Sequence, residues 1–82
     1  PNPPYIEERN NYTGSYRKSF LIPADWKGQQ VYLHVGSATS NLMVWVNGKY
    51  VGYSQVAHST SEFDVTDYLL EGENTLAVLV LK

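Results

Sequence analysis

The chain has 82 residues, of which 43% are hydrophobic and 17% are charged, and its net charge at pH 7 is −2. A chain of this length forms at most one domain with a thin core, and its composition differs from that of disordered proteins. The six basic residues are scattered, so we expect no nucleic-acid partner. The sequence has no cysteine and no apolar run of about 18 residues, so we expect no disulfide, no thiolate metal site and no contact with a membrane.

The N-terminal residues 1–14 are expected to form an extended arm followed by a loop. Prolines at positions 1, 3 and 4 lack the N–H group that a central strand needs, and residues 10–14 are rich in turn formers. We therefore treat 1–82 as a single, partial β-sandwich domain whose strands lie within residues 15–82.

Two strands are predicted in the first half of this region. Residues 16–22 are rich in strand formers and end at Pro23, and residues 31–35 alternate between apolar and polar side chains. Alternation at period two places every second side chain on the same face. The inward positions are then Tyr16, Phe20 and Ile22 in the first strand and Val31, Leu33 and Val35 in the second.

The strongest local signal is the dipeptide Asn47-Gly48 between two apolar runs, 42–46 and 49–53. Asn-Gly in this setting is typical of a type I′ hairpin turn, because both turn residues need a positive φ. The resulting register predicts Trp45 opposite Tyr50 on one face and Val44 opposite Val51 on the other.

The C-terminal third contains one ambiguous segment and one clear strand. Residues 61–70 are interpreted as a single helical turn that Asp64 or Thr66 caps and that stops before Gly72. Residues 75–81 are apolar on both faces, so we expect a strand covered on both sides. Five short strands with regular turn signals indicate an antiparallel sandwich or barrel, with open edges beside the last strand.

No catalytic or metal site is predicted. Glycoside hydrolysis needs two carboxylates about 5–10 Å apart, but the acidic residues lie mostly in turns and no pair can be named. Ser59, His58 and Asp64 could be combined into a triad, yet no strained nucleophile turn such as G-x-S-x-G accompanies them. His34 and His58 share no metal-ligand spacing.

The aromatic residues suggest a second interpretation. Trp45, Tyr50 and Tyr53 could form a platform on which sugar rings stack, as in a free-standing carbohydrate-binding module. Cross-strand aromatic pairs more often stabilise the sheet, so we favour core or interdomain packing. A buried Trp45 would support packing, whereas a flat, exposed ring would support sugar binding.

Several motifs resemble a known family. They are N-P-P-Y at 2–5, T-G-S-Y-R at 13–17, V-W-V-N-G at 44–48, V-G-Y-S-Q at 51–55, S-E-F-D at 61–64 and G-E-N-T-L at 72–76. In this order they resemble the N-terminal jelly-roll, sugar-binding domain of family 2 glycoside hydrolases, in particular bacterial β-galactosidases. The resemblance implies an all-β, antiparallel jelly-roll or galactose-binding-like sandwich, of which this chain is an incomplete portion.

The resemblance also implies where the chemistry of such an enzyme lies. Both catalytic glutamates would belong to a barrel outside this chain, which the chain would contact as its partner. Asn11 would be the counterpart of a residue in the substrate pocket. The parent family uses Mg²⁺ and Na⁺, and Val56 stands where the family would place a Na⁺-binding Asp, so we expect no cofactor here.

The leading hypothesis is a non-catalytic segment that supports the catalytic barrel of a glycosidase and shapes its substrate entrance. The alternatives are the carbohydrate-binding module and a module that binds protein through open sheet edges. We also expect the isolated chain to self-associate, and the sequence leaves the bacterial periplasm and the cytoplasm equally open as its compartment.

Overall fold

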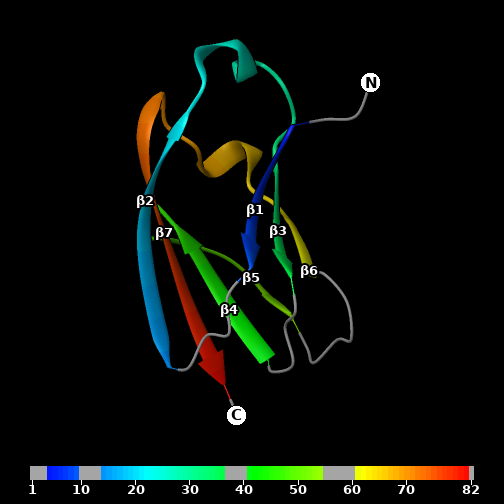
Figure 1. The fold of residues 1–82 in the computed structure, drawn as a ribbon, viewed down its shortest axis with the longest axis vertical. Coiled ribbons are helices and arrows are strands. Elements are labelled where there is room, and N and C mark those ends of the chain that lie inside the picture. Colours follow the sequence, from blue (N-terminus) through cyan, green and yellow to red (C-terminus); the bar gives the residue numbers. More distant parts are fainter. Residues whose placement is uncertain (1–3, 10–13, 37–40, 55–60, 82) are drawn as a thin grey trace.

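The fold is a two-sheet β-sandwich, seen here in a computed structural model that describes residues 4–9, 14–36, 41–54 and 61–81. Figure 1 shows the two sheets facing each other. The strands are β1 (Tyr5–Arg9), β2 (Ser15–Ile22), β3 (Tyr32–Gly36), β4 (Asn41–Val46), β5 (Lys49–Ser54), β6 (Ser61–Asp64) and β7 (Gly72–Leu81).

One sheet has three strands in the order β1-β3-β6, and the other has four in the order β2-β7-β4-β5. All pairs are antiparallel except β1 with β3, which is parallel. The all-β sandwich predicted from the sequence is confirmed, but it is not antiparallel throughout. Because β2 and β4 flank β7 on both sides, the prediction of an open edge beside the last strand was wrong.

The core lies between the two sheets and is filled by one face of each strand. In β4 and β7 every second residue is buried, as a period of two requires. The fully or nearly fully buried apolar side chains are Val31, Leu33, Val35, Leu42, Val44, Val46, Phe63, Val65, Leu76, Val78 and Val80. Tyr16 and Phe20 of β2 pack against this core, as their predicted inward positions require.

The hairpin between β4 and β5 forms at the predicted turn. Asn47 and Gly48 have φ values of 53° and 78°, so both occupy the positive-φ region that a type I′ turn needs. Trp45 lies opposite Tyr50 as predicted. The second predicted pair was wrong, because the register shifts between Val44 and Trp45, and Gly52 rather than Val51 lies opposite Val44.

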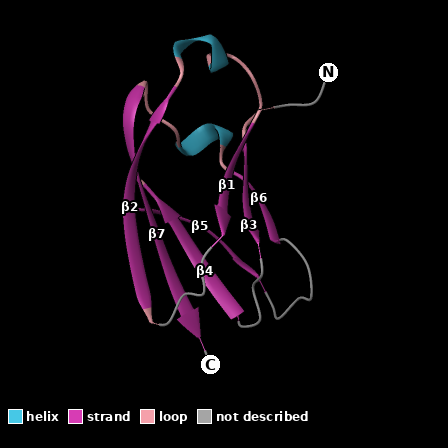
Figure 2. Cartoon of the chain, viewed as in Figure 1, coloured by secondary structure: helices cyan, strands magenta, loops and turns pink. Residues whose placement is uncertain are grey.

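Two short 3-10 helices close one end of the sandwich (Figure 2). They are η1 (Ala24–Trp26) and η2 (Thr66–Tyr68). The helical turn predicted over 61–70 is therefore confined to η2, and residues 61–64 form β6 instead. Neither helix is long enough to cross a membrane, and no other helix occurs in the described ranges.

The N-terminal segment also differs from its prediction. Tyr5–Arg9, assigned from the sequence to an arm, forms β1 and pairs with β3 along its whole length. The sandwich therefore begins before residue 15. The prolines that argued against a strand all precede β1, where the missing N–H groups do not interrupt the ladder.

Candidate functional site

The outer face of the four-stranded sheet carries the candidate site. Strand pairing aligns Arg17 of β2, Ala77 of β7, Trp45 of β4 and Tyr50 of β5 in one row across the sheet. We call this row the aromatic–arginine row. It consists of outward-facing positions, because its neighbours along β4 and β7 are buried.

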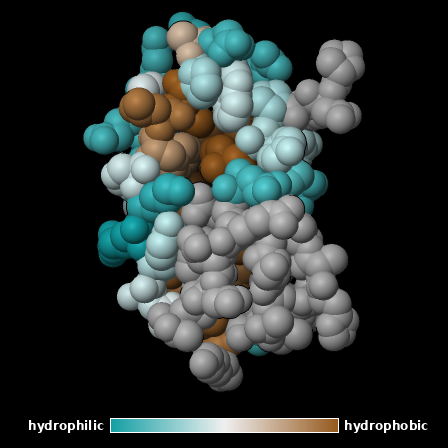
Figure 3. Space-filling view, in the orientation of Figure 1, coloured by the Kyte–Doolittle hydropathy of each residue, from teal (hydrophilic) through white to brown (hydrophobic). Residues whose placement is uncertain are grey.

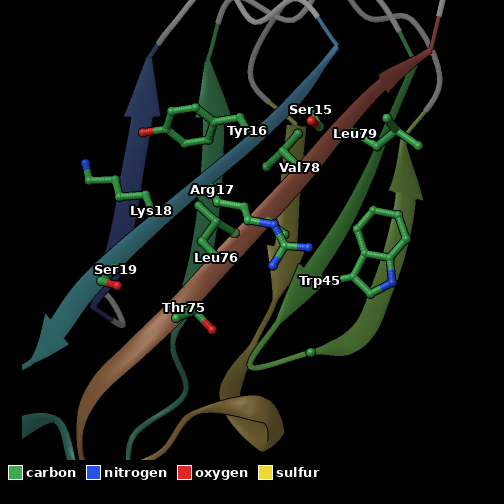
Figure 4. A pocket seen from close by; sticks show the side chains of 12 residues that line it. Ser15, Tyr16, Arg17, Lys18, Ser19, Trp45, Thr75, Leu76, Val78 and Leu79 are labelled. Atoms are coloured by element: carbon green, nitrogen blue, oxygen red, sulfur yellow. The ribbon is translucent and has the colours of Figure 1, made fainter.

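A groove of about 710 Å³ lies on this face. Figure 4 shows Arg17 reaching from β2 across β7 toward Trp45, with Leu79 beside them. The lining residues include two basic residues and no acidic residue. They are Ser15, Tyr16, Arg17, Lys18, Ser19, Trp45, Gly48, Thr75, Leu76, Ala77, Val78 and Leu79.

The three aromatic residues singled out in the sequence share this outer face. Trp45 is half-buried and contacts Tyr50 edge-to-face, with ring centroids 5.6 Å apart and planes at 60°. Tyr50 and Tyr53 are 47% and 46% exposed. Of these three residues, Trp45 lines the groove and the two tyrosines lie beside it on β5.

A β-bulge explains how Tyr50 and Tyr53 reach the same face although three positions separate them. In a regular strand this spacing would place them on opposite faces. Here Tyr50 pairs with Trp45 and Gly52 with Val44, so Val51 is the extra residue between two consecutive pairs. Tyr53 then pairs with Met43, another outward-facing position.

The Asn-Gly and G-E-N motifs meet in one hydrogen-bond network. Asn47 Nδ2 donates to Asn74 Oδ1 at 2.7 Å and to the Tyr68 carbonyl at 2.8 Å. Asn74, which is only 1% exposed, also donates to the carbonyls of Leu70 and Gly72 and accepts from the Leu70 N–H. We call this set the asparagine network. Sequence reasoning missed it because its two asparagines are 27 residues apart.

The outer face of the three-stranded sheet carries a different cluster. His34 Nε2 lies 2.9 Å from a carboxylate oxygen of Glu62 on the neighbouring strand β6. The Tyr5 ring stacks on the His34 ring with centroids 4.5 Å apart. These contacts tie β1 and β6 to the central strand β3, so His34 has a structural role in the sheet.

Asp64 belongs to a local turn and not to a catalytic pair. Its carboxylate accepts hydrogen bonds from the hydroxyl and the N–H of Thr66, at 2.6 and 3.1 Å. These bonds, together with a weaker one from Gln30, lower the pKa of Asp64 below its ordinary value of 3.8. Among the described residues, no group of three or more His, Asp or Glu could hold a metal ion.

Several residues from the sequence analysis lie outside the described residues, namely Asn11, Val56, His58 and Ser59. The aliphatic side chain of Val56 has no atom that can bind Na⁺, so the cation implied by the family resemblance does not fit this position.

A second cavity of about 270 Å³ lies between the two 3-10 helices. Figure 3 shows an apolar patch at this end of the molecule. Ile22, Trp26, Leu69 and Leu70 contribute apolar walls to the cavity, and Leu70 is 59% exposed.

Comparison with known proteins gives consistent matches. The family model described as "Glycosyl hydrolases family 2, sugar binding domain" matches residues 2–82. A β-galactosidase from Priestia megaterium is 42% identical over 80 residues, which are 98% of this chain and 8% of that protein. A β-galactosidase from Clostridium acetobutylicum is 45% identical over 80 residues, 98% of this chain and 9% of that protein.

Solved structures give the same result. A β-glucuronidase from an uncultured Clostridium species matches with a TM-score of 0.74 and 36% identity, covering 80% of this chain and 12% of that one. A β-D-mannosidase from Dictyoglomus thermophilum matches with a TM-score of 0.73 and 32% identity, covering 82% and 8%. The chain thus spans less than a tenth of the curated relatives it matches. By sequence and by fold, it belongs to family 2 of the glycosyl hydrolases, within the sugar binding domain.

Proposed function

We propose that the chain is a non-catalytic segment of a β-galactosidase-like enzyme, which supports the catalytic barrel and shapes the substrate entrance. The asparagine network is the main support for this proposal. It occupies the residues of two family motifs with hydrogen bonds that join the β4–β5 hairpin to the start of β7. Motif residues that stabilise the sandwich are the ones that a supporting domain needs.

The catalytic carboxylates are proposed to lie outside this chain. Retaining and inverting glycosidases need two carboxyl groups facing one substrate. Here Glu62 pairs with His34 and Asp64 bonds Thr66, so both carboxylates have structural partners. The curated relatives are many times longer than this chain, which leaves ample sequence for a catalytic domain elsewhere.

Two sequence hypotheses remain part of this proposal. Asn11 is the candidate for direct contact with substrate, on the strength of its position in the N-N-Y-T-G stretch. Val56 is proposed to leave the parent enzyme without the Na⁺ ligand that an Asp would supply there.

A chimera tests the supporting role. The matching segment of the Priestia megaterium β-galactosidase is replaced by these 82 residues, and turnover of an activated galactoside is measured. We expect the chimera to keep activity within about tenfold, and deletion of the segment to abolish it. A deletion variant that folds, assembles and turns over the galactoside normally would refute the supporting role.

The isolated chain tests the non-catalytic assignment. We expect it to show no turnover of the same galactoside. Turnover that disappears when one acidic residue of this chain is replaced would place catalysis here and overturn the proposal.

A further inference from the structure

The floor of the groove on the four-stranded sheet is formed by Ala77 of β7. Arg17 and Trp45 are both paired with Ala77, one from each side. Because alanine has the smallest side chain after glycine, Ala77 forms a low floor, over which the guanidinium arm of Arg17 reaches across β7 toward the indole ring of Trp45 (Figure 4). Leu79 continues this floor along β7, in the next outward-facing position.

The lining of the groove is amphipathic. Trp45, Ala77 and Leu79 offer apolar surface, while hydroxyl groups are contributed by Ser15 and Ser19 of β2 and by Thr75 of β7. Sugar rings combine one apolar face with a rim of hydroxyl groups, and an aromatic ring beside hydrogen-bonding side chains complements both. The volume of about 710 Å³ lies within the range of ligand sites.

The charge of the groove favours acidic sugars over neutral ones. Arg17 is exposed and makes no ion pair or hydrogen bond with another described residue. Arg17 supplies the positive charge that faces the groove, because Lys18 alternates with it along β2 and its side chain points away from Trp45 (Figure 4). No acidic residue lines the groove, although the whole chain has a net charge of −2. A planar guanidinium is suited to binding a carboxylate through two parallel hydrogen bonds.

From these observations we propose that the groove binds an acidic oligosaccharide, with a uronic acid carboxylate on Arg17 and an adjacent sugar ring on Trp45. The ligand is an oligomer because the groove crosses three strands, β2, β7 and β4, on an open sheet face. This site extends the carbohydrate-binding alternative by adding Arg17 and Ala77, and it does not depend on the proposed supporting role.

Binding is measured on the full 82-residue chain by calorimetry and by tryptophan fluorescence. The probes are a short oligogalacturonide and a neutral galactose oligomer of equal length. We expect the oligogalacturonide to bind at least about tenfold more tightly, because a charge-assisted bidentate contact is available only to the acid. Its affinity is expected to fall with added salt.

Three variants locate the site. Arg17→Gln should weaken oligogalacturonide binding about tenfold or more and remove the preference over the neutral oligomer. Ala77→Leu should fill the floor and weaken both probes. Lys49→Gln is the matched control, because it removes an exposed positive charge outside the groove and should change binding less than twofold.

The result that overturns the proposal is equal affinity for the two oligomers, or no binding of the acid by the folded chain. Equal losses in Arg17→Gln and Lys49→Gln would also overturn it, because they would show a general charge effect. Circular dichroism of each variant confirms that it is folded. If a second copy of the chain occupied the groove, the dimeric chain would fail to bind the oligogalacturonide, and this result would also contradict the proposal.

Discussion

Replacement of Asn74 by alanine tests the asparagine network most directly. The side-chain amide makes four hydrogen bonds of 2.6 to 3.0 Å, to Asn47, to the N–H and carbonyl of Leu70 and to the carbonyl of Gly72. Alanine removes all four. Asn47 keeps its bond to the Tyr68 carbonyl, so the groups left without a partner are the three backbone groups of Leu70 and Gly72.

The expected loss of stability follows from these three groups. A buried polar group without a partner costs about 1–3 kcal/mol. The turn that carries Leu70 and Gly72 is partly exposed, so water can reach these groups and the lower end of the range applies. We therefore expect Asn74→Ala to cost about 3 kcal/mol. A domain of this size has a total stability of roughly 4–12 kcal/mol, so the loss is a large fraction of it.

Urea denaturation followed by the fluorescence of Trp26 and Trp45 measures this loss. Two-state analysis gives the free energy of unfolding, and the slope with urea should stay unchanged. The control is Glu73→Ala on the same strand, where an exposed side chain is removed and the change should stay within about 0.5 kcal/mol. If Asn74→Ala shifts the midpoint no more than Glu73→Ala, the network does not stabilise the fold and the reasoning is refuted.

Three further predictions concern the turn, the pH dependence and the assembly of the chain. Gly48→Val should lower the free energy of unfolding by about 1–3 kcal/mol in the same assay. The cause is strain at a φ of 78° rather than a clash, since a Cβ there meets no atom within 4 Å; an unchanged midpoint would contradict the type I′ turn. Because hydrogen bonds from Thr66 lower the folded pKa of Asp64, its contribution to stability is present above pH 3.8 and is lost as pH falls through the folded pKa. The denaturation midpoint should therefore fall less between pH 5 and pH 3 in Asp64→Asn than in the unmodified chain. An equal fall in the two proteins would argue against this effect. The isolated chain should self-associate at micromolar concentration, now through the edge of β2, which pairs only with β7 among the described strands; sedimentation that shows a clean monomer would contradict this.

The sequence predicted those parts of the fold that depend on local chemistry. Asn47-Gly48 specifies its turn through backbone sterics, so the hairpin and the Trp45–Tyr50 pair followed directly. The alternation at Val31, Leu33 and Val35 identified the buried face of β3 without knowledge of its neighbours.

The missed features depend on contacts between distant segments. β1 is a strand only because β3 lies beside it, since three of its five residues are charged and give it a weak strand propensity of its own. The strand order was also hidden, because β7 inserts between β2 and β4, far from both in the sequence. The groove followed from that order, as Arg17 and Trp45 become neighbours only across Ala77.

The bulge at Val51 connects the inside of the sandwich to its outer face. Gly52 faces inward at this point, and a Cβ added there would lie 3.4 Å from the Phe63 ring of β6. This distance is an ordinary van der Waals contact, so Gly52 packs directly against Phe63 where β5 and β6 meet. In a regular strand of the same sequence, Tyr50 and Gly52 would lie on one face, because side chains alternate strictly. The bulge at Val51 thus places Gly52 against Phe63 in the core and keeps the exposed Tyr50 and Tyr53 beside Trp45. Deletion of Val51 would therefore alter core packing and the aromatic surface together.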